Sequence, residues 1–139
     1  MRVFFDTSAL AKRYVEENRS EQVRVLCAEA DALGISVLVV PELVSTLCRL
    51  MREGRLSDRH YRSLKSAMQA DLSDADLCDL SQAVLEKTLS CLERHPLRAL
   101  DALHLGSALV YQPDLFVSAD RRQAEAAGRE GLKVMDLSQ

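Results

Sequence analysis

The sequence lacks the cysteine pattern of a zinc-binding or disulfide-stabilised protein. Only four of its 139 residues are cysteine, and no two of them form a C-x-x-C pair. They lie far apart within otherwise apolar helical patterns, at Cys27, Cys48, Cys78 and Cys91. This spacing argues against a zinc site and against a disulfide framework. Reduced, buried thiols in a cytoplasmic protein fit it better.

Long apolar runs are also missing. No apolar stretch reaches the roughly 18 residues that are needed to span a bilayer. The N-terminus has no basic segment followed by an apolar one, so it shows no visible export signal. We therefore expect a cytoplasmic protein that is not associated with a membrane.

An excess of positive charge is absent as well. Lysine and arginine number 18 against 21 aspartates and glutamates, which gives a formal net charge of −3 and a pI near 5.6. This balance argues against a broad basic surface for nucleic acid, but it leaves room for local basic patches. If several of the acids hold a metal ion, the formal count overstates the negative charge that a substrate meets.

Short apolar runs alternate with helical patterns along the whole chain. Strands are expected near residues 1–5, 33–37, 77–80, 115–117 and 132–135. Helices are expected over residues 9–15, 20–30, 37–53, 58–70, 81–94, 97–111 and 121–127. Ser20 is the expected N-cap of the second helix, Gly54 and Gly128 are expected helix stops, and Pro41 leaves the start of the third helix open.

This alternation predicts a mostly parallel sheet that is covered by helices on both faces. The chain is 47% hydrophobic, which is enough for an independent core, and it contains no linker, internal repeat or low-complexity tract. We therefore expect residues 1–139 to form a single α/β domain.

Two carboxylates directly follow apolar strands. Asp6 comes after the first strand, with the hydroxyls of Thr7 and Ser8 beside it, and Asp120 comes after the run at 115–117, with Ser118 nearby. The carboxyl ends of parallel strands meet at one edge of a sheet, where ligand sites form in open α/β folds. An ordinary helix N-cap remains an alternative for each of the two.

Two further acids stand in apolar surroundings. Asp101 lies within a helical pattern that is apolar on nearly every side, and Glu42 is the only charge between Asp31 and Arg49. A buried carboxylate without a partner costs several kcal/mol, so each needs a partner, a shifted pKa or a cation. Pairing of Asp101 with Arg98 or another basic residue, and a place for Glu42 in the first turn of its helix, remain alternatives.

Four acids from four segments would repel one another strongly unless a positive charge lies between them. Magnesium or manganese meets that need, since hard divalent ions take oxygen ligands. The imidazole of His104 suits such a site less well, so we interpret it as a structural, hydrogen-bonded histidine. No persuasive Ser-His-Asp or Cys-His arrangement is present.

Other charged residues are assigned to the surface. The aspartates of residues 71–79 are interpreted as a solvated link. A basic row repeats at intervals of three and four residues, which favours a solvated helix face, with a phosphate-binding patch as the minority alternative; the row comprises Arg52, Arg55, Arg59, Arg62 and Lys65. Arg121 and Arg122, next to Asp120, are better placed to meet an anionic substrate.

Four segments of the sequence resemble the PIN-domain ribonucleases, and specifically the VapC toxins of bacterial toxin–antitoxin pairs. They span most of the chain in the order of the family, at residues 5–12, 41–43, 97–105 and 116–124. The resemblance implies a five-stranded parallel sheet between helices, an α/β/α fold. Gly106 stands where an alanine is common, and we expect this change to loosen helix packing without affecting the chemistry.

The resemblance assigns an acidic quartet of Asp6, Glu42, Asp101 and Asp120, with Ser8 and Ser118 as supporting hydroxyls. Lys12, in the first matched segment, is a further candidate for substrate binding. The resemblance also implies an RNA substrate, an antitoxin that masks the site, and a homodimer formed through helices.

The residues themselves suggest how such a site would act. Asp6 and Asp101 are the expected primary ligands of Mg²⁺ or Mn²⁺, while Glu42 and Asp120 bind through water or position the nucleophile. Alternative functions are a receiver-like signalling domain, a dehalogenase-type phosphatase and a catalytically silent PIN-like module. The first lacks a second acid after the first strand and a lysine after a late one, and the second lacks an acid two positions after Asp6.

Overall fold

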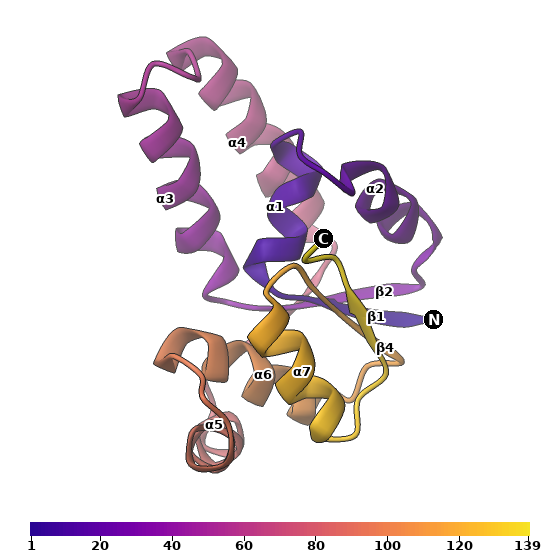
Figure 1. Ribbon diagram of the computed structural model, residues 1–139. Coiled ribbons are helices and arrows are strands. Elements are labelled where there is room, and N and C mark those ends of the chain that lie inside the picture. Colours follow the sequence, from indigo (N-terminus) through magenta and orange to yellow (C-terminus); the bar gives the residue numbers. More distant parts are fainter.

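Five parallel strands form a central sheet in the computed structural model, which describes all residues 1–139 (Figure 1). In spatial order they are β3 (Asp76–Cys78), β2 (Ala32–Ser36), β1 (Arg2–Phe5), β4 (Leu115–Ser118) and β5 (Val134–Asp136). Every neighbouring pair is parallel. In chain order, β1, β2 and β3 build one half of the sheet from its centre outward, and β4 and β5 then build the other half. The carboxyl ends of β1 and β4 therefore flank a topological switch point, where open α/β sheets bind ligands.

Seven helices cover the two faces of this sheet (Figure 1). They are α1 (Thr7–Tyr14), α2 (Ser20–Glu29), α3 (Val39–Arg52), α4 (Asp58–Ser73), α5 (Gln82–Arg94), α6 (Ala99–Tyr111) and α7 (Arg121–Arg129). The helices α1, α2, α3 and α4 pack on one face of the sheet in one hydrophobic core. The helices α5, α6 and α7 pack on the other face in a second core. The expected three-layer α/β/α architecture is therefore confirmed.

The central strand shows how the sequence produces two cores. Val3 and Phe5 are fully buried in the first core, and Phe4 is fully buried in the second. Successive side chains of a strand point to opposite faces, so a strand covered on both faces is apolar throughout. Phe4 stacks on Phe116 of β4, with ring centroids 5.9 Å apart. This packing fixes β1 and β4 side by side and so fixes where the two strands end.

The helices α3 and α4 form an antiparallel pair that reaches beyond the sheet (Figure 1). Gly54 follows α3 with a φ of 73°, a left-handed conformation that suits glycine, and it ends the helix as expected. Ser57 caps α4 by accepting a hydrogen bond from the amide of His60. Pro41 lies in the first turn of α3, where a missing amide hydrogen is tolerated. We call residues 39–73, which comprise α3, α4 and their loop, the arm.

Two local expectations about helix ends are wrong. Gly128 does not end the last helix, because α7 continues to Arg129 and the left-handed turn is made by Gly131, with a φ of 93°. Ser20 is not an N-cap but the first residue of α2, and Arg19 before it adopts a φ of 75°. The hydroxyl of Ser20 instead accepts a hydrogen bond from the amide of Glu17.

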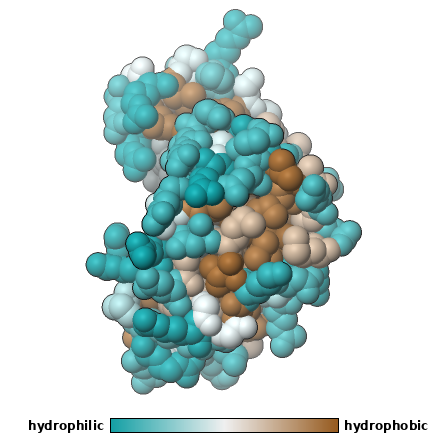
Figure 2. All heavy atoms as spheres, turned by 45° about the vertical axis from the view of Figure 1, so that its right-hand side comes forward, coloured by the Kyte–Doolittle hydropathy of each residue, from teal (hydrophilic) through white to brown (hydrophobic).

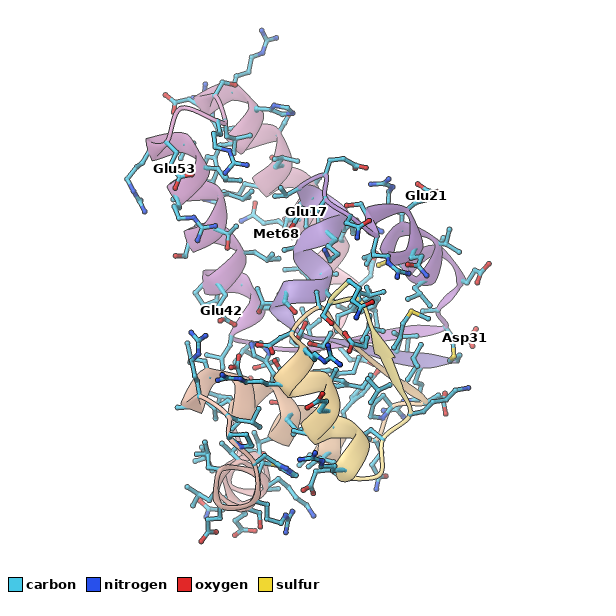
Figure 3. All side chains as sticks on the ribbon, viewed as in Figure 1. Glu17, Glu21, Asp31, Glu42, Glu53 and Met68 are labelled. Atoms are coloured by element: carbon cyan, nitrogen blue, oxygen red, sulfur yellow. The ribbon has the colours of Figure 1, made fainter.

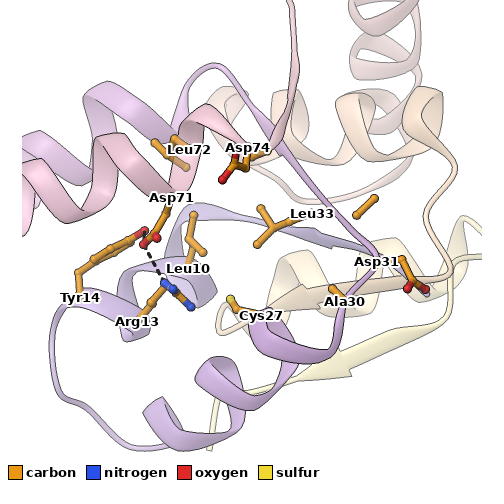
Figure 4. Close-up of a pocket in the computed structure, with 12 residues that line it drawn as sticks. Leu10, Arg13, Tyr14, Cys27, Ala30, Asp31, Leu33, Asp71, Leu72 and Asp74 are labelled. Carbon is orange, nitrogen blue, oxygen red and sulfur yellow. Dashed lines mark hydrogen bonds and ion pairs between the residues drawn. The ribbon is translucent and has the colours of Figure 1, made fainter.

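The expected solvated link at residues 71–79 is also only partly correct. Asp71 belongs to α4, and its carboxylate accepts hydrogen bonds from Arg13 Nε at 3.0 Å and from the Tyr14 hydroxyl at 2.8 Å. This polar network ties α1 to α4 on the wall of a cavity of about 280 Å³, and neither Asp6 nor Asp120 lines that cavity (Figure 4). Arg13 and Asp71 form an ion pair there, so neither charge lacks a partner.

The four cysteine thiols are free, but only Cys91 is fully buried. Burial raises the pKa of Cys27, Cys78 and Cys91 above the usual value, so these thiols stay protonated near neutral pH. None of the helices is both long and apolar enough to cross a membrane.

Candidate active site

Asp6 lies at the carboxyl end of β1 and caps α1. Its side chain is 1% exposed. Oδ1 accepts hydrogen bonds from the Ala9 amide at 2.9 Å and the Ser8 hydroxyl at 2.7 Å, and Oδ2 accepts one from the Ser118 hydroxyl at 2.5 Å. Burial raises the pKa of Asp6 and outweighs these hydrogen bonds. The N-cap role is therefore real, but it leaves a buried carboxylate whose charge is poorly solvated.

The end of β4 is bound to the end of β1 through two serines. The Ser118 hydroxyl donates to Asp6 and accepts a hydrogen bond from the Asp120 amide at 3.0 Å. The Ser8 hydroxyl accepts one from the Ala119 amide at 2.9 Å. Asp120 in turn caps α7 by accepting from the amides of Arg122 and Gln123. The two acids that follow apolar strands thus share one edge of the sheet and one hydrogen-bond network.

Glu42 reaches the same edge from the first turn of α3. Its Oε1 accepts hydrogen bonds from the Thr7 hydroxyl at 2.7 Å and from His104 Nε2 at 2.6 Å. Burial raises the pKa of Glu42, but the hydrogen bonds from His104 and Thr7 outweigh burial and hold the pKa below its ordinary value. Glu42 therefore stays ionised at neutral pH, with one oxygen free of these partners.

His104 is buried on α6, with its side chain 3% exposed. Because a carboxylate only accepts, Nε2 must carry the hydrogen that it shares with Glu42. The other ring nitrogen, Nδ1, is buried without a hydrogen-bond partner. The interpretation of His104 as a hydrogen-bonded structural histidine agrees with this geometry, and its partner is one of the four acids.

Asp101 lies in the first turn of α6 and not in its middle, because Leu97 and Arg98 precede the helix. It is half-buried. Burial raises its pKa, and the negative charge of Asp120 raises it further, against the opposing effect of Arg98. Glu42 also raises it to a smaller extent, so the three acids lie within electrostatic reach of one another. Asp101 forms no ion pair with Arg98 or with any other basic residue, so that alternative is wrong.

A polar cavity of about 200 Å³ opens beside Asp101 and Asp120. Its lining consists of one proline and five charged residues, namely Pro96, Arg98, Asp101, Asp120, Arg121 and Arg122. Arg121 and Arg122 therefore lie where the sequence places them, next to the acids. Arg98 completes the basic rim; the sequence offered it only as a partner for Asp101.

Lys12 does not belong to this group. Its side chain is 8% exposed, and Nζ donates a hydrogen bond to the Asn18 carbonyl at 2.9 Å. Nζ also lies 3.9 Å from a carboxylate oxygen of Glu17. Both partners belong to the loop that follows α1, so the ammonium group holds that loop and is not available to a substrate in this conformation.

The donor set is suited to a hard divalent cation, although no group of three or more acids, histidines or cysteines is close enough to form a ready-made metal site. All four expected donors are carboxylates, which Mg²⁺ and Mn²⁺ prefer. The mutual repulsion that raises the pKa of Asp101, and the poorly solvated charge of Asp6, are both relieved by a cation held between them. The chemistry of the donors, all of them carboxylate oxygens, therefore fits such an ion.

Comparison with known proteins identifies the fold. The model of the PIN domain matches residues 3–129. The chain belongs to the PIN-domain family. Membership in this family excludes the receiver-like and dehalogenase-type alternatives.

Relatives of this PIN domain include Ribonuclease VapC45 of Mycobacterium tuberculosis, which is 30% identical over 134 residues that cover 95% of this chain and 93% of the relative. Solved structures that share the fold include two toxins or toxin complexes. VapC20 of M. tuberculosis, described as a toxin that cleaves the sarcin-ricin loop, is 19% identical with a TM-score of 0.68, over 89% of this chain and 94% of that one. A chain of a toxin-antitoxin complex from Klebsiella pneumoniae is 16% identical with a TM-score of 0.65, over 87% and 88%.

The side chains that support the acids are partly invisible in the sequence. Thr7 was noted only as a neighbour of Asp6, yet its hydroxyl binds Glu42, 35 positions away. Gln123 is buried, and its amide donates to the Asp101 carbonyl at 3.0 Å, which joins α7 to α6. The only sequence signal for Thr7 is its place beside the end of β1, and the only one for Gln123 is its place within the matched segment 116–124.

Proposed function

We propose that this PIN domain is a metal-dependent endoribonuclease of the VapC type, the toxin of a toxin–antitoxin pair, and that it hydrolyses RNA phosphodiester bonds. One observation supports the proposal: the strand-end acids Asp6 and Asp120 share a hydrogen-bond network at the switch point of the sheet, and the charges of Asp120 and Glu42 both raise the pKa of Asp101. The name of a relative that matches 95% of the chain supports ribonuclease activity.

Each side chain has a role that its environment supports. A divalent ion, when bound, supplies a Lewis acid that lowers the pKa of water and neutralises phosphate charge. Asp6 and Asp101 would hold it, with Ser8 and Ser118 keeping Asp6 in place. Glu42 and Asp120 orient the attacking water and accept its proton. Arg98, Arg121 and Arg122 bind phosphates beside the scissile bond, since exposed guanidinium groups pair well with phosphate.

Cleavage of a pool of structured RNAs tests the proposal. We expect cleavage with Mg²⁺ or Mn²⁺, none with chelator, and a loss of about a hundredfold or more in Asp101→Asn, because loss of a metal ligand removes several kcal/mol of transition-state stabilisation. Glu29→Gln removes one charge from an exposed position on α2 and should cleave normally. Equal cleavage by all proteins, or cleavage that resists chelator, would contradict the proposal. No cleavage by the natural chain would favour the catalytically silent module.

His104 is expected to position Glu42. Replacing it with leucine removes a hydrogen bond to a charged acceptor, worth about 1.5–3 kcal/mol, so the RNA cleavage rate at saturating substrate should fall roughly ten- to a hundredfold. His104→Gln keeps an N–H donor at similar reach and should recover most of the rate. Thermal unfolding of both variants controls for the buried position. Equal rates in the leucine and glutamine variants would show that the hydrogen bond to Glu42 does not matter.

We also propose two protein partners. The K. pneumoniae neighbour comes from a toxin-antitoxin complex, which supports an antitoxin partner that masks the acidic site. A homodimer would need exposed apolar surface, and α5 and the start of α6 supply it with Leu85, Leu89 and Leu100, which are 41%, 61% and 48% exposed.

A further inference from the structure

The outer half of the arm concentrates positive charge in an otherwise acidic molecule. Residues 49–65 hold six of the 18 basic residues and two of the 21 acidic ones, for a net charge of +4, which leaves −7 on the rest of the chain. The basic residues are Arg49, Arg52, Arg55, Arg59, Arg62 and Lys65. Figure 1 shows that this part of α3 and α4 lies furthest from the sheet, and hydrophilic side chains surround its end in Figure 2.

Most of this charge is not used within the fold. Arg52, Arg59 and Arg62 are exposed and form no ion pair. Arg49 and Arg55 share a single carboxylate, Glu53, at 3.9 and 3.5 Å. Exposed pairs of this kind contribute little to stability, so the row is not explained by a folding role.

The helix α3 connects the row to the acidic site. Glu42 is bound to Thr7 and His104 at the inner end of α3, and Figure 3 shows Glu53 at the outer end. Arg49 lies seven residues after Glu42, which is close to two turns, so both side chains share one face of the helix about 10 Å apart. The charge begins near the site and continues outward along the arm.

A second basic surface lies on the other side of the acids. Arg98, Arg121 and Arg122 rim the cavity beside Asp101 and Asp120, at the start of α6 and α7. The four carboxylates therefore lie between two groups of basic residues, in which Arg98 and Arg122 on one side and Arg52, Arg59 and Arg62 on the other form no ion pair, whereas Arg121 pairs with Glu125 at 3.3 Å. A polyanion that crosses the site would contact positive charge on both sides of the acidic edge. A single small anion would need only one of these basic groups.

We propose that the arm binds the phosphate backbone of a structured RNA at a distance from the bond that is cleaved. This inference rests on the proposed ribonuclease function and adds to it that the substrate class is an RNA large enough to span the acidic edge and the arm. The arm reads backbone shape and charge, whereas base contacts at the cavity select the cleaved position. The row is largely exposed, as expected for a solvated helix face, and the proposal adds the phosphate-binding alternative to it.

Equilibrium RNA binding tests the proposal without catalysis, in an Asp6→Asn background with chelator. The arm variant is Arg52→Gln with Arg59→Gln, and the control is Lys87→Gln with Lys133→Gln, which removes two exposed, unpaired charges elsewhere. For a hairpin RNA at 0.1 M salt, the arm variant should bind about tenfold more weakly or worse. Its slope of log K against log salt should fall in magnitude by about 1.5, or 0.7–0.9 per lost phosphate contact.

The control variant should bind the hairpin within about twofold of its Asp6→Asn parent, and both should bind a single-stranded hexanucleotide equally well. Unchanged hairpin binding by the arm variant, or equal weakening in both variants, would overturn the proposal. So would loss of binding to the purified antitoxin with RNA binding intact, since that outcome assigns the arm to a protein partner. Failure of the natural chain to cleave any RNA would overturn the proposed function and leave this binding result in force.

Discussion

Replacing Asp6 with asparagine is expected to abolish RNA cleavage and, without metal, to make the fold more stable. The carboxylate is fully buried at the switch point, and burial raises its pKa. Its ionised form is therefore strained when no cation is bound, and the neutral amide removes that penalty. Catalysis depends on the same charge, so we expect a loss of about a thousandfold in cleavage rate.

The surrounding hydrogen bonds can accommodate the amide. The side-chain oxygen of the introduced asparagine would accept from the Ser8 hydroxyl and the Ala9 amide, as Oδ1 of Asp6 does now. The new NH₂ group would donate to the Ser118 oxygen, whose hydroxyl is then free to donate to the Asp120 carbonyl, 3.2 Å away. No buried donor or acceptor is lost, so the charge effect should decide the sign.

The pH dependence follows from the raised pKa. Between the ordinary value of 3.8 and the raised value, the folded state binds more protons than the unfolded state, so the stability of the natural chain falls as pH rises through that window. The Asp6→Asn variant has no carboxyl group at this position, so its stability does not fall in this window. The difference in stability between the variant and the natural chain should therefore be greatest at neutral pH and should shrink in acid.

Thermal unfolding with chelator, from acid to neutral pH, measures this difference, and Asp74→Asn provides a control at an exposed aspartate. Added Mg²⁺ or Mn²⁺ should stabilise the natural chain and the control but not Asp6→Asn. If Asp6→Asn unfolds at a lower temperature than the natural chain at neutral pH without metal, burial does not strain the Asp6 carboxylate. Metal stabilisation that persists in this variant would remove Asp6 from the ligand set.

The acids could be selected from the sequence because each stands in a context that ordinary surface carboxylates avoid. Asp6 and Asp120 end apolar strands, and Glu42 lies in an apolar stretch. The alternation of strands and helices likewise predicted the layers of the fold. Asp101 was recognised for the same reason, although its place in the first turn was missed because Leu97 and Arg98 fit the helical pattern without joining the helix.

What the sequence could not predict was which polar side chains find distant partners. Lys12 has the appearance of a substrate contact, but its ammonium group is bound to the loop after α1. Asp71 lies in a run of aspartates that suggests solvent, yet it is bound to Arg13 and Tyr14 across 57 or more positions. Local pattern gives the face on which a residue lies, whereas long-range hydrogen bonds depend on how helices meet.

The second large effect concerns Gly106, where the sequence suggested that alanine would improve packing. The structure indicates the opposite. A Cβ atom on Gly106 would lie 2.4 Å from Thr88 Oγ1, 2.9 Å from the Val84 carbonyl oxygen and 3.0 Å from the Thr88 amide nitrogen. Two of these atoms belong to the backbone of α5, and the Thr88 hydroxyl is itself held by the Val84 carbonyl at 2.7 Å. Glycine therefore allows α6 to approach α5 closely.

Gly106→Ala should lower the free energy of unfolding by about 1–3 kcal/mol, since α5 and α6 must move apart to admit the methyl group. Gly128→Ala is the matched control: this exposed glycine lies within α7 with nothing within 4 Å of its Cβ position, so alanine should stabilise the protein by about 0.5–1 kcal/mol. Denaturant unfolding of both variants measures the two changes in the free energy of unfolding, which should have opposite signs. Adding Thr88→Ala should restore part of the loss, because it removes the nearest atom but leaves both backbone contacts. A Gly106→Ala variant as stable as the natural chain would show that the helices separate without cost.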